Sequence, residues 1–164
     1  MQAQTTARLN IEPLDTKDAS FIFELLNSSG WLKFIGDRNI HSENDAVAYI
    51  LKIIANPNCQ YWVFRIKEIN TPIGIITLIK RDHFEHPDIG FAMLPKYEKL
   101  GYTFEASKHI LNELVRNRAY SQIIAITLKD NFKSIRLLEK LGLTFEKIVK
   151  DAEEELMLYS ISLV

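Results

Sequence analysis

The sequence has little cysteine and no long apolar run. Cys59 is the only cysteine among 164 residues, so an internal disulfide bond is excluded. No uninterrupted apolar stretch approaches the roughly 20 residues that cross a bilayer as a helix, and the first residues lack the basic and apolar regions of a secretory signal. We therefore expect a cytoplasmic protein that does not associate with a membrane.

An excess of charge of either sign is also lacking. The chain has 20 Lys and Arg residues against 21 Asp and Glu residues, and its formal net charge is −1. Nucleic-acid-binding domains are usually strongly basic, so we expect no nucleic acid partner. Hydrophobic residues make up 47% of the chain, which at this length predicts one core. The expected organisation is a flexible N-terminal segment over 1–7 and a single domain over 8–164.

Hydrophobic periodicity and turn residues predict the order βαα, βββ, αβ, αββ along the chain. The expected strands are 8–14, 60–68, 73–80, 88–94, 121–128, 143–149 and 154–163. The expected helices are 19–29, 43–56, 101–117 and 130–142, with a glycine-containing aromatic loop over 30–40. Because a helical crossover joins parallel strands, the strands on either side of helix 101–117 should be parallel neighbours. The other strands can be antiparallel, which gives a mixed sheet covered by helices on both faces.

The stretch PKYEKLGYT, residues 95–103, is a loop between a predicted strand and a predicted helix. Such a loop presents unpaired backbone N–H groups and the positive end of the helix dipole, which together favour a phosphate. Gly101 has no Cβ, so a ligand can approach the backbone closely. Six basic residues are expected at the same end of the sheet: Lys96, Lys99, Lys129, Lys133, Arg136 and Lys140. The pattern indicates a polyanion site, unless Gly101 only starts the helix and the basic residues are ordinary surface charges.

Two segments carry a resemblance to a known family. DIGFAMLPKYEKLGYTFEASKHIL and, further on, IIAITLKDNFKSIRLLEKLGLTFEK resemble the GNAT superfamily of N-acetyltransferases, in the branch of the RimJ and RimL ribosomal-protein acetyltransferases. FIGDRNI with the later AVAYI is similar to the amino-terminal signature of one clade of that branch. The resemblance extends from Leu9 to Leu163.

The resemblance implies an α/β (α+β) GNAT fold. This is a mixed central sheet of about seven strands with helices on both faces, in which two central parallel strands splay apart to form the cofactor cleft. It also implies acetyl-CoA as the cofactor, no metal, and a monomer or homodimer. The acceptor would be a small-molecule amine or a peptide N-terminus. The amine would attack the thioester directly, without a covalent enzyme intermediate.

The resemblance also implies which residues contact acetyl-CoA. The family pattern at the diphosphate is Gln or Arg, two residues, Gly, one residue, then Gly or Ala, so Glu98 and Thr103 depart from it. Glu98 would oppose a phosphate by about 1 kcal/mol, and Lys99 is expected to offset this. The implied diphosphate contacts are Lys99, Leu100, Gly101, Tyr102, Thr103 and Phe104. Further contacts are expected from Asn131 and Ser134 and from the main chain of Phe91, Met93 and Leu94, whose amides would bind the oxyanion.

Two side chains are candidates for proton transfer. An alkyl ammonium with a pKa near 10.4 is almost entirely protonated at pH 7, so a base is needed. Asp88, at the start of its strand, is the candidate base; the alternative is that it caps a turn after Pro87. Many relatives protonate the thiolate with a tyrosine, but Leu138 occupies that position. Ser134 lies on the inward stripe of the same helix and is the remaining candidate acid, unless its hydroxyl bonds its own backbone.

The acceptor side is expected to come from the loop between the first two helices. Trp31, Phe34, Asp37 and Arg38 offer an aromatic wall and two opposite charges, although the two aromatic residues could equally be core. His83 and His86 have carboxylates nearby but no helix to fix their geometry, so we expect no metal site.

The alternatives to an acetyltransferase are a non-catalytic acyl-CoA binder and a nucleotide-binding αβ protein. The altered diphosphate loop and the missing tyrosine would suit the acyl-CoA binder.

Overall fold

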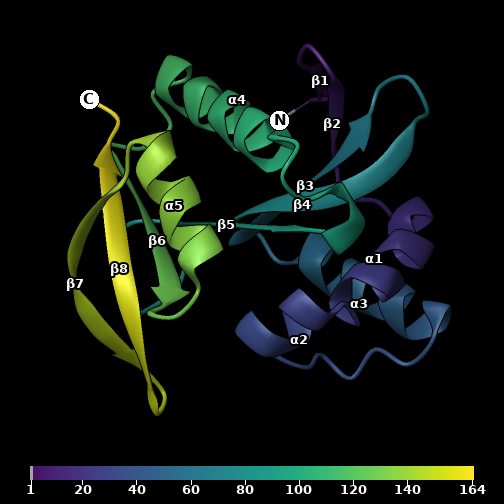
Figure 1. The fold of residues 1–164 in the computed structure, drawn as a ribbon, viewed down its shortest axis with the longest axis horizontal. Coiled ribbons are helices and arrows are strands. Elements are labelled where there is room, and N and C mark those ends of the chain that lie inside the picture. Colours follow the sequence, from purple (N-terminus) through teal and green to yellow (C-terminus); the bar gives the residue numbers. More distant parts are fainter. Residues whose placement is uncertain (1) are drawn as a thin grey trace.

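The computed structural model describes residues 2–164, in which eight strands form one mixed sheet with helices on both faces (Figure 1). The strands are β1 (Gln4–Thr5), β2 (Leu9–Pro13), β3 (Cys59–Ile66), β4 (Thr71–Ile79), β5 (Asp88–Met93), β6 (Gln122–Leu128), β7 (Thr144–Asp151) and β8 (Glu154–Ser162). The α-helices are α1 (Ala19–Leu26), α2 (Ser29–Phe34), α3 (Glu43–Ala55), α4 (Tyr102–Arg116) and α5 (Phe132–Leu141), with 3-10 turns at Thr16–Asp18 and Pro95–Tyr97. The predicted fold class and element order are confirmed.

Two elements were not predicted. β1 lies within the segment expected to be flexible, where Gln4 pairs with Ile11 of β2; residue 1 of that segment lies outside the described residues. α2 replaces the first half of the expected loop over 30–40, and it buries Trp31 to 6% exposure. Gly30 in α2 has open space around it, so this glycine does not mark a turn. The helix forms because packing of the Trp31 ring outweighs the low helix propensity of glycine.

The strand order is β1-β2-β3-β4-β5-β6-β8-β7, and β5 with β6 is the one parallel pair of this sheet within residues 2–164. The parallel neighbours on either side of α4 are therefore confirmed. Their pairing is limited to Asp88 opposite Ile124, whereas β4 pairs with the whole of β5. Beyond that one pair, β5 and β6 separate. We call the opening between them the fork and the Asp88–Ile124 end its vertex.

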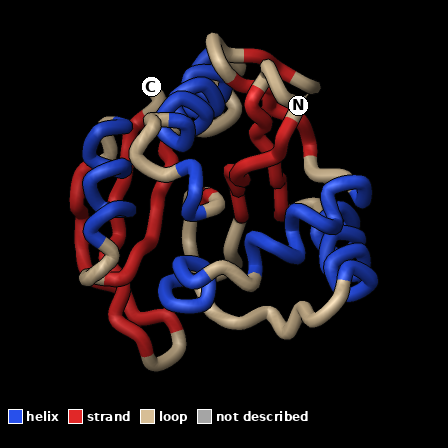
Figure 2. Tube along the Cα trace, turned by 45° about the vertical axis from the view of Figure 1, so that its right-hand side comes forward, coloured by secondary structure: helices blue, strands red, loops and turns tan. Residues whose placement is uncertain are grey.

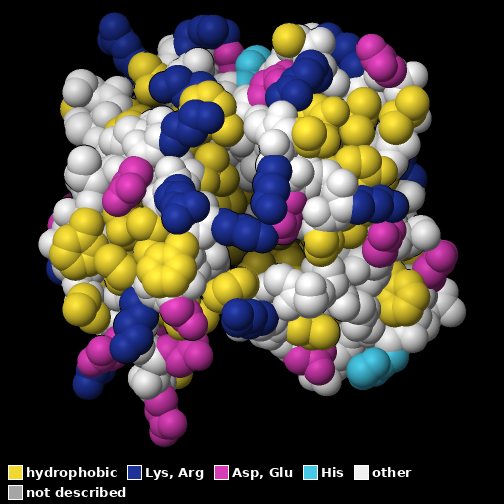
Figure 3. Space-filling model, in the orientation of Figure 1, with side chains coloured by type: hydrophobic (Ala, Val, Ile, Leu, Met, Phe, Trp, Pro, Cys, Tyr) yellow, Lys and Arg dark blue, Asp and Glu magenta, His cyan; other side chains and the backbone are white. Residues whose placement is uncertain are grey.

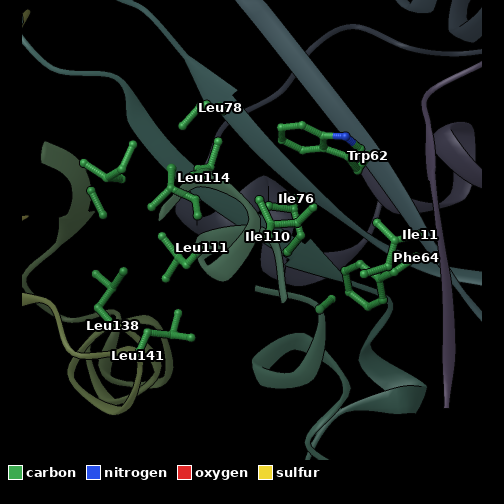
Figure 4. Close-up of a cluster of buried hydrophobic side chains, with 14 of the residues drawn as sticks. Ile11, Trp62, Phe64, Ile76, Leu78, Ile110, Leu111, Leu114, Leu138 and Leu141 are labelled. Atoms are coloured by element: carbon green, nitrogen blue, oxygen red, sulfur yellow. The ribbon is translucent and has the colours of Figure 1, made fainter. Parts of the chain in front are cut away.

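Helices lie on both faces of the sheet (Figure 2), and two apolar clusters hold them there. α4 and α5 cover one face, where Ile110 of α4 and Leu138 of α5 pack against a cluster that includes Trp62 and Phe64 (Figure 4). The first three α-helices cover the other face around Ile22, Ile50, Val63 and Ile75. Burial of each large apolar side chain contributes about 1.5 to 3 kcal/mol. The two layers leave the fork at the centre of the sheet.

The strand alternation assigns the side chains of β5 to the two faces. Phe91 and Met93 pack toward the α4 and α5 face, and Ala92 packs toward the α1 to α3 face. Because side chains alternate along a strand, Gly90 and Asp88 share the face of Ala92. Side chains of β5 therefore border the fork on both faces of the sheet.

Candidate active site

The unpaired edge of β5 lines the fork with free backbone groups. At the vertex the Pro87 carbonyl accepts from the Ile124 N–H at 3.0 Å, so odd-numbered residues turn their backbone groups toward β6. The amides of Phe91 and Met93 therefore face the fork. Leu94 does not join them, because its amide donates to the Ile73 carbonyl at 2.8 Å on the β4 side. Its side chain is also buried, with 3% exposure.

The loop before α4 concentrates further backbone donors. We call residues 98–104 the Gly101 loop. Lys99 and Gly101 both have left-handed backbones, with φ of 65° and 81°. The Glu98 amide bonds to Pro95 and the Glu105 amide to Gly101, but within the described chain no acceptor is bonded to the amides of residues 99–104. Consecutive free amides at the start of a long helix favour an anion.

On the face of the molecule shown in Figure 3, basic side chains surround a hollow lined by hydrophobic side chains. Lys133 of α5 donates to Glu98 at 2.6 Å, and Lys140, in the last turn of the same helix, lies 4.3 Å from the centre of the Phe104 ring. We expected Lys99 to offset the charge of Glu98, but the partner is Lys133. The carboxylate that departs from the family pattern is therefore neutralised by α5, 35 residues away in sequence.

Three polar residues lie next to the fork, and two of them have side-chain hydrogen bonds. Asn131 is the N-cap of α5 and accepts from the Ser134 amide at 3.3 Å. The Ser134 hydroxyl has no hydrogen bond to any other described residue and stays half-buried. Thr103 turns its hydroxyl toward the Met93 sulfur at 3.4 Å, which ties the Gly101 loop to β5.

Asp88 lies at the vertex of the fork. The carboxylate is 5% exposed and accepts from Arg81 Nε at 3.0 Å and from the Ile126 N–H of β6. Burial raises the pKa of Asp88 to about 6, against the opposing effect of the Arg81 charge. The carboxylate is ionised in most molecules at pH 7 and takes up a proton just below it, which is the range of a working general base.

A polar row crosses the α1 to α3 face beside the vertex. Tyr61 of β3 lies opposite Thr77 of β4, and Thr77 lies opposite Gly90 of β5. A Cβ at Gly90 would come within 2.7 Å of the Thr77 hydroxyl, so only glycine fits there without a shift. Burial raises the pKa of Tyr61 and Tyr49, so both hydroxyls stay protonated at neutral pH. Sequence reasoning missed this row, since its members are spread over four elements.

The predicted acceptor residues occupy different environments. Trp31 is core, and its indole N–H has no partner among the described residues. Phe34 is half-buried beside the Lys33 ammonium, 4.9 Å from the ring centre. The Asp37 carboxylate accepts from the Asn39 amide at 2.7 Å and shapes the turn. Arg38 is exposed, and its charge acts on the Tyr49 hydroxyl. Of the four, Arg38 is the one that extends the polar row.

Within residues 2–164 no three His, Cys, Asp or Glu side chains gather in a way that could hold a metal ion. No helix in this range has both the length and the hydropathy needed to cross a bilayer.

Comparison with known proteins identifies the family to which the chain belongs. The model of a family described as an acetyltransferase (GNAT) domain matches residues 8–144. The chain belongs to the GNAT acetyltransferase family. The family resemblance and the prediction of an N-acetyltransferase are thereby confirmed. GNAT enzymes use acetyl-CoA.

Individual relatives agree with the family. The uncharacterized N-acetyltransferase YnaD of Bacillus subtilis strain 168 is 28% identical over 146 residues, which cover 89% of this chain and 85% of YnaD. The ribosomal-protein-S5-alanine acetyltransferase of Vibrio fischeri has the same fold, with a TM-score of 0.83, 18% identity and coverage of 99% and 97% of the two chains. RimL, a ribosomal L7/L12 alpha-N-protein acetyltransferase solved with coenzyme A, aligns with a TM-score of 0.84, 13% identity and coverage of 97% and 96%.

Proposed function

We propose that this GNAT enzyme transfers the acetyl group of acetyl-CoA to a primary amine of a peptide N-terminus or a small molecule. The observation that carries the proposal is the fork, because β5 and β6 pair at one position and then leave the edge of β5 free. Free backbone amides line the β5 edge of the fork, and further free amides follow in the Gly101 loop. A carboxylate with a pKa of about 6 stands at the vertex.

The residues present fit acetyl-CoA, which would supply an activated acetyl thioester. The amides of residues 99–104 and the surrounding lysines would hold its diphosphate, with Gly101 allowing the backbone to turn. The backbone groups of Phe91 and Met93 would hold the extended pantetheine arm of acetyl-CoA. One of these amides would also donate to the oxyanion that forms at the thioester carbonyl, a contact typically worth about 3 to 4 kcal/mol. Asn131 and Ser134 border the same opening from α5.

Asp88 would accept the proton that the attacking amine loses, directly or through a water. A base with a pKa of about 6 takes a proton from an α-ammonium, whose pKa is about 7.7 to 8.0, more readily than from a lysine ammonium near 10.4. α-Amines should therefore be better acceptors than lysine-like amines. The polar row of Tyr61 and Thr77, with Arg38 beyond it, would face the acceptor from the α1 to α3 side.

Ser134 would donate a proton to the departing thiolate. Ser134→Ala is expected to lower kcat by only about tenfold, because a thiolate with a pKa near 8.5 leaves fairly readily without a proton. The unfolding temperature should not change, since the hydroxyl has no hydrogen bond to a described residue. Steady-state kinetics and thermal unfolding check the two halves of this prediction, and an unchanged kcat would remove Ser134 from the mechanism.

The Glu98–Lys133 ion pair should tune the affinity for CoA. Lys133→Ala uncovers the Glu98 charge beside the Gly101 loop and should weaken CoA binding about two- to fivefold at low salt. Glu98→Gln should strengthen binding by a similar factor, and the double variant should return close to the original affinity. Calorimetric titration at two salt concentrations checks this; equal affinities for Lys133→Ala and the unchanged protein at low salt would contradict it.

The proposed reaction is tested by incubating acetyl-CoA with a panel of acceptors and measuring free thiol and acetylated product. The panel needs peptide N-termini, because two structural neighbours are named as acetyltransferases of ribosomal proteins. It also needs amino acids, polyamines and lysine-like amines. The proposal predicts thiol release with at least one α-amine. If CoA raises the unfolding temperature but no acceptor releases thiol above background, the non-catalytic acyl-CoA binder is correct instead.

A further inference from the structure

We propose that Arg8 is a positioning residue for CoA, which acts by holding the Leu100 peptide of the Gly101 loop in its binding orientation. The inference rests on the proposed function only in taking CoA as the ligand of this loop. Arg8 immediately precedes β2, and Figure 1 shows β1 beside the first turns of α4. The N-terminal segment thus reaches a loop that lies more than 90 residues away in sequence.

The Arg8 guanidinium contacts the Gly101 loop and the first turn of α4. Its Nε donates to Glu105 Oε2 at 2.7 Å, and its backbone N–H donates to Glu105 Oε1 at 2.9 Å. Its Nη1 donates to the Leu100 carbonyl at 2.9 Å, and the guanidinium lies 4.4 Å from the centre of the Tyr102 ring. The Thr6 hydroxyl donates to the same Glu105 carboxylate at 2.5 Å. Three contacts, with Glu105, Leu100 and Tyr102, therefore fix the guanidinium against the loop, and two further bonds hold the Glu105 carboxylate.

The bond to Leu100 determines where the next amide points. The Leu100 carbonyl and the Gly101 N–H belong to one planar trans peptide, so they point in opposite directions. Arg8 holds the carbonyl toward β2, and in the sheet β2 is separated from the fork by β3 and β4. The Gly101 N–H is thereby directed away from Arg8. A glycine at φ of 81° could otherwise rotate this peptide at little cost.

The charge on Arg8 is paired with the carboxylate of Glu105. Although burial disfavours ionisation of Glu105, the bonds from Thr6 and Arg8 hold the pKa of its carboxyl below the ordinary value. Nη2 lies 3.5 Å from the place that a Cβ of Gly101 would occupy, and within the described residues it makes no hydrogen bond. Arg8 lines an open hollow of about 480 Å³ together with residues that include Lys108 and His109.

The test compares a whole ligand with a truncated one. CoA binding is measured by calorimetry, and acetyl transfer is measured with acetyl-CoA and with the acetyl thioester of N-acetylcysteamine, which lacks the diphosphate. Arg8→Ala should weaken CoA binding about 10- to 100-fold, while transfer from the truncated thioester stays within about twofold. Arg8→Lys keeps the charge but cannot hold Leu100 and Glu105 together. Its CoA affinity should therefore lie between that of Arg8→Ala and that of the unchanged protein. The control is Arg116→Ala, because Arg116 is also ion-paired but lies at the other end of α4.

Two results would overturn the inference. Equal CoA affinity in Arg8→Ala and the unchanged protein would show that the loop needs no support from Arg8. Equal losses with both thioesters, together with a lower unfolding temperature in Arg8→Ala and Arg8→Lys, would show that Arg8 only holds the N-terminal segment in place. A failure of the proposed function is distinct, because then the unchanged protein itself does not bind CoA.

Discussion

Asp88→Asn is expected to lower kcat for acetyl transfer by about 10²- to 10⁴-fold at pH 8, the contribution usual for a general base. The asparagine keeps the size of the side chain and an acceptor for the Ile126 N–H, but it cannot take up a proton. In the unchanged enzyme kcat/KM should rise through pH 6 as the carboxyl ionises, and the variant should lack this rise. A pH–rate profile of both proteins measures the difference. A profile that keeps its rise near pH 6 in the variant would remove Asp88 as the base.

The same substitution gives a stability prediction of known sign. The pKa of Asp88 in the folded protein is about 6 against an ordinary 3.8, because burial disfavours the charged form. The stabilisation from holding the protonated form is complete below pH 3.8 and is lost as the pH rises through 6. The free energy of unfolding should therefore fall by about 3 kcal/mol relative to Asp88→Asn between pH 3.5 and pH 8. Denaturant unfolding of both proteins at the two pH values checks this.

The loss of the Arg81 partner in Asp88→Asn does not alter this sign. The pKa of about 6 for Asp88 already includes the opposing effect of the Arg81 charge, so the loss of the ion pair adds no separate pH dependence. The difference between the two proteins then reports the titration of residue 88. A difference independent of pH would mean that the carboxylate is paired or solvated well enough to keep an ordinary pKa.

Gly101→Val is expected to weaken CoA binding about 10- to 100-fold while the fold persists. Gly101 has φ of 81°, a region that a β-branched residue adopts only with strain. With valine, the loop either adopts another conformation, in which its amides are separated, or returns to this one when CoA binds. The return costs free energy and so weakens binding. The residue is exposed, so the apolar clusters should remain packed. Calorimetry for affinity and circular dichroism for the fold are the measurements.

Gly30→Ala is the matched control for Gly101→Val. Gly30 lies in α2 with no atom within 4 Å of an added Cβ, and alanine is the better helix former. The control should raise the unfolding temperature slightly and leave CoA affinity unchanged. A Gly101→Val protein that binds CoA as tightly as the control would show that the left-handed turn is dispensable.

The second half of the fold could be predicted because its signals are local. Helical spacing of apolar residues and glycine boundaries delimit α4 and α5, and both boundary glycines have positive φ, 81° at Gly101 and 98° at Gly142. β1 and α2 were missed because each is too short to show a period. They form through contacts with β2 and with the apolar cluster around Trp31.

The site could be predicted only where one local segment carries it. The backbone donors of the Gly101 loop follow from a strand, a loop and a helix in succession, so that region was found from sequence. The pairing of Arg8 with Glu105 and of Lys133 with Glu98 depends on how separate elements pack, and no local pattern indicates it. Asp88 lies between these cases. Its place at a strand start is local, but its burial and its pKa depend on how β6 diverges from β5.

The most direct test of the account is a calorimetric titration of ligand-stripped protein with CoA. The fork and the free amides of residues 99–104 predict one CoA per chain, with a Kd of about 1 to 100 µM that weakens in Gly101→Val. Absence of binding heat up to millimolar CoA, from protein that unfolds cooperatively, would contradict the assignment of this loop and fork to acetyl-CoA.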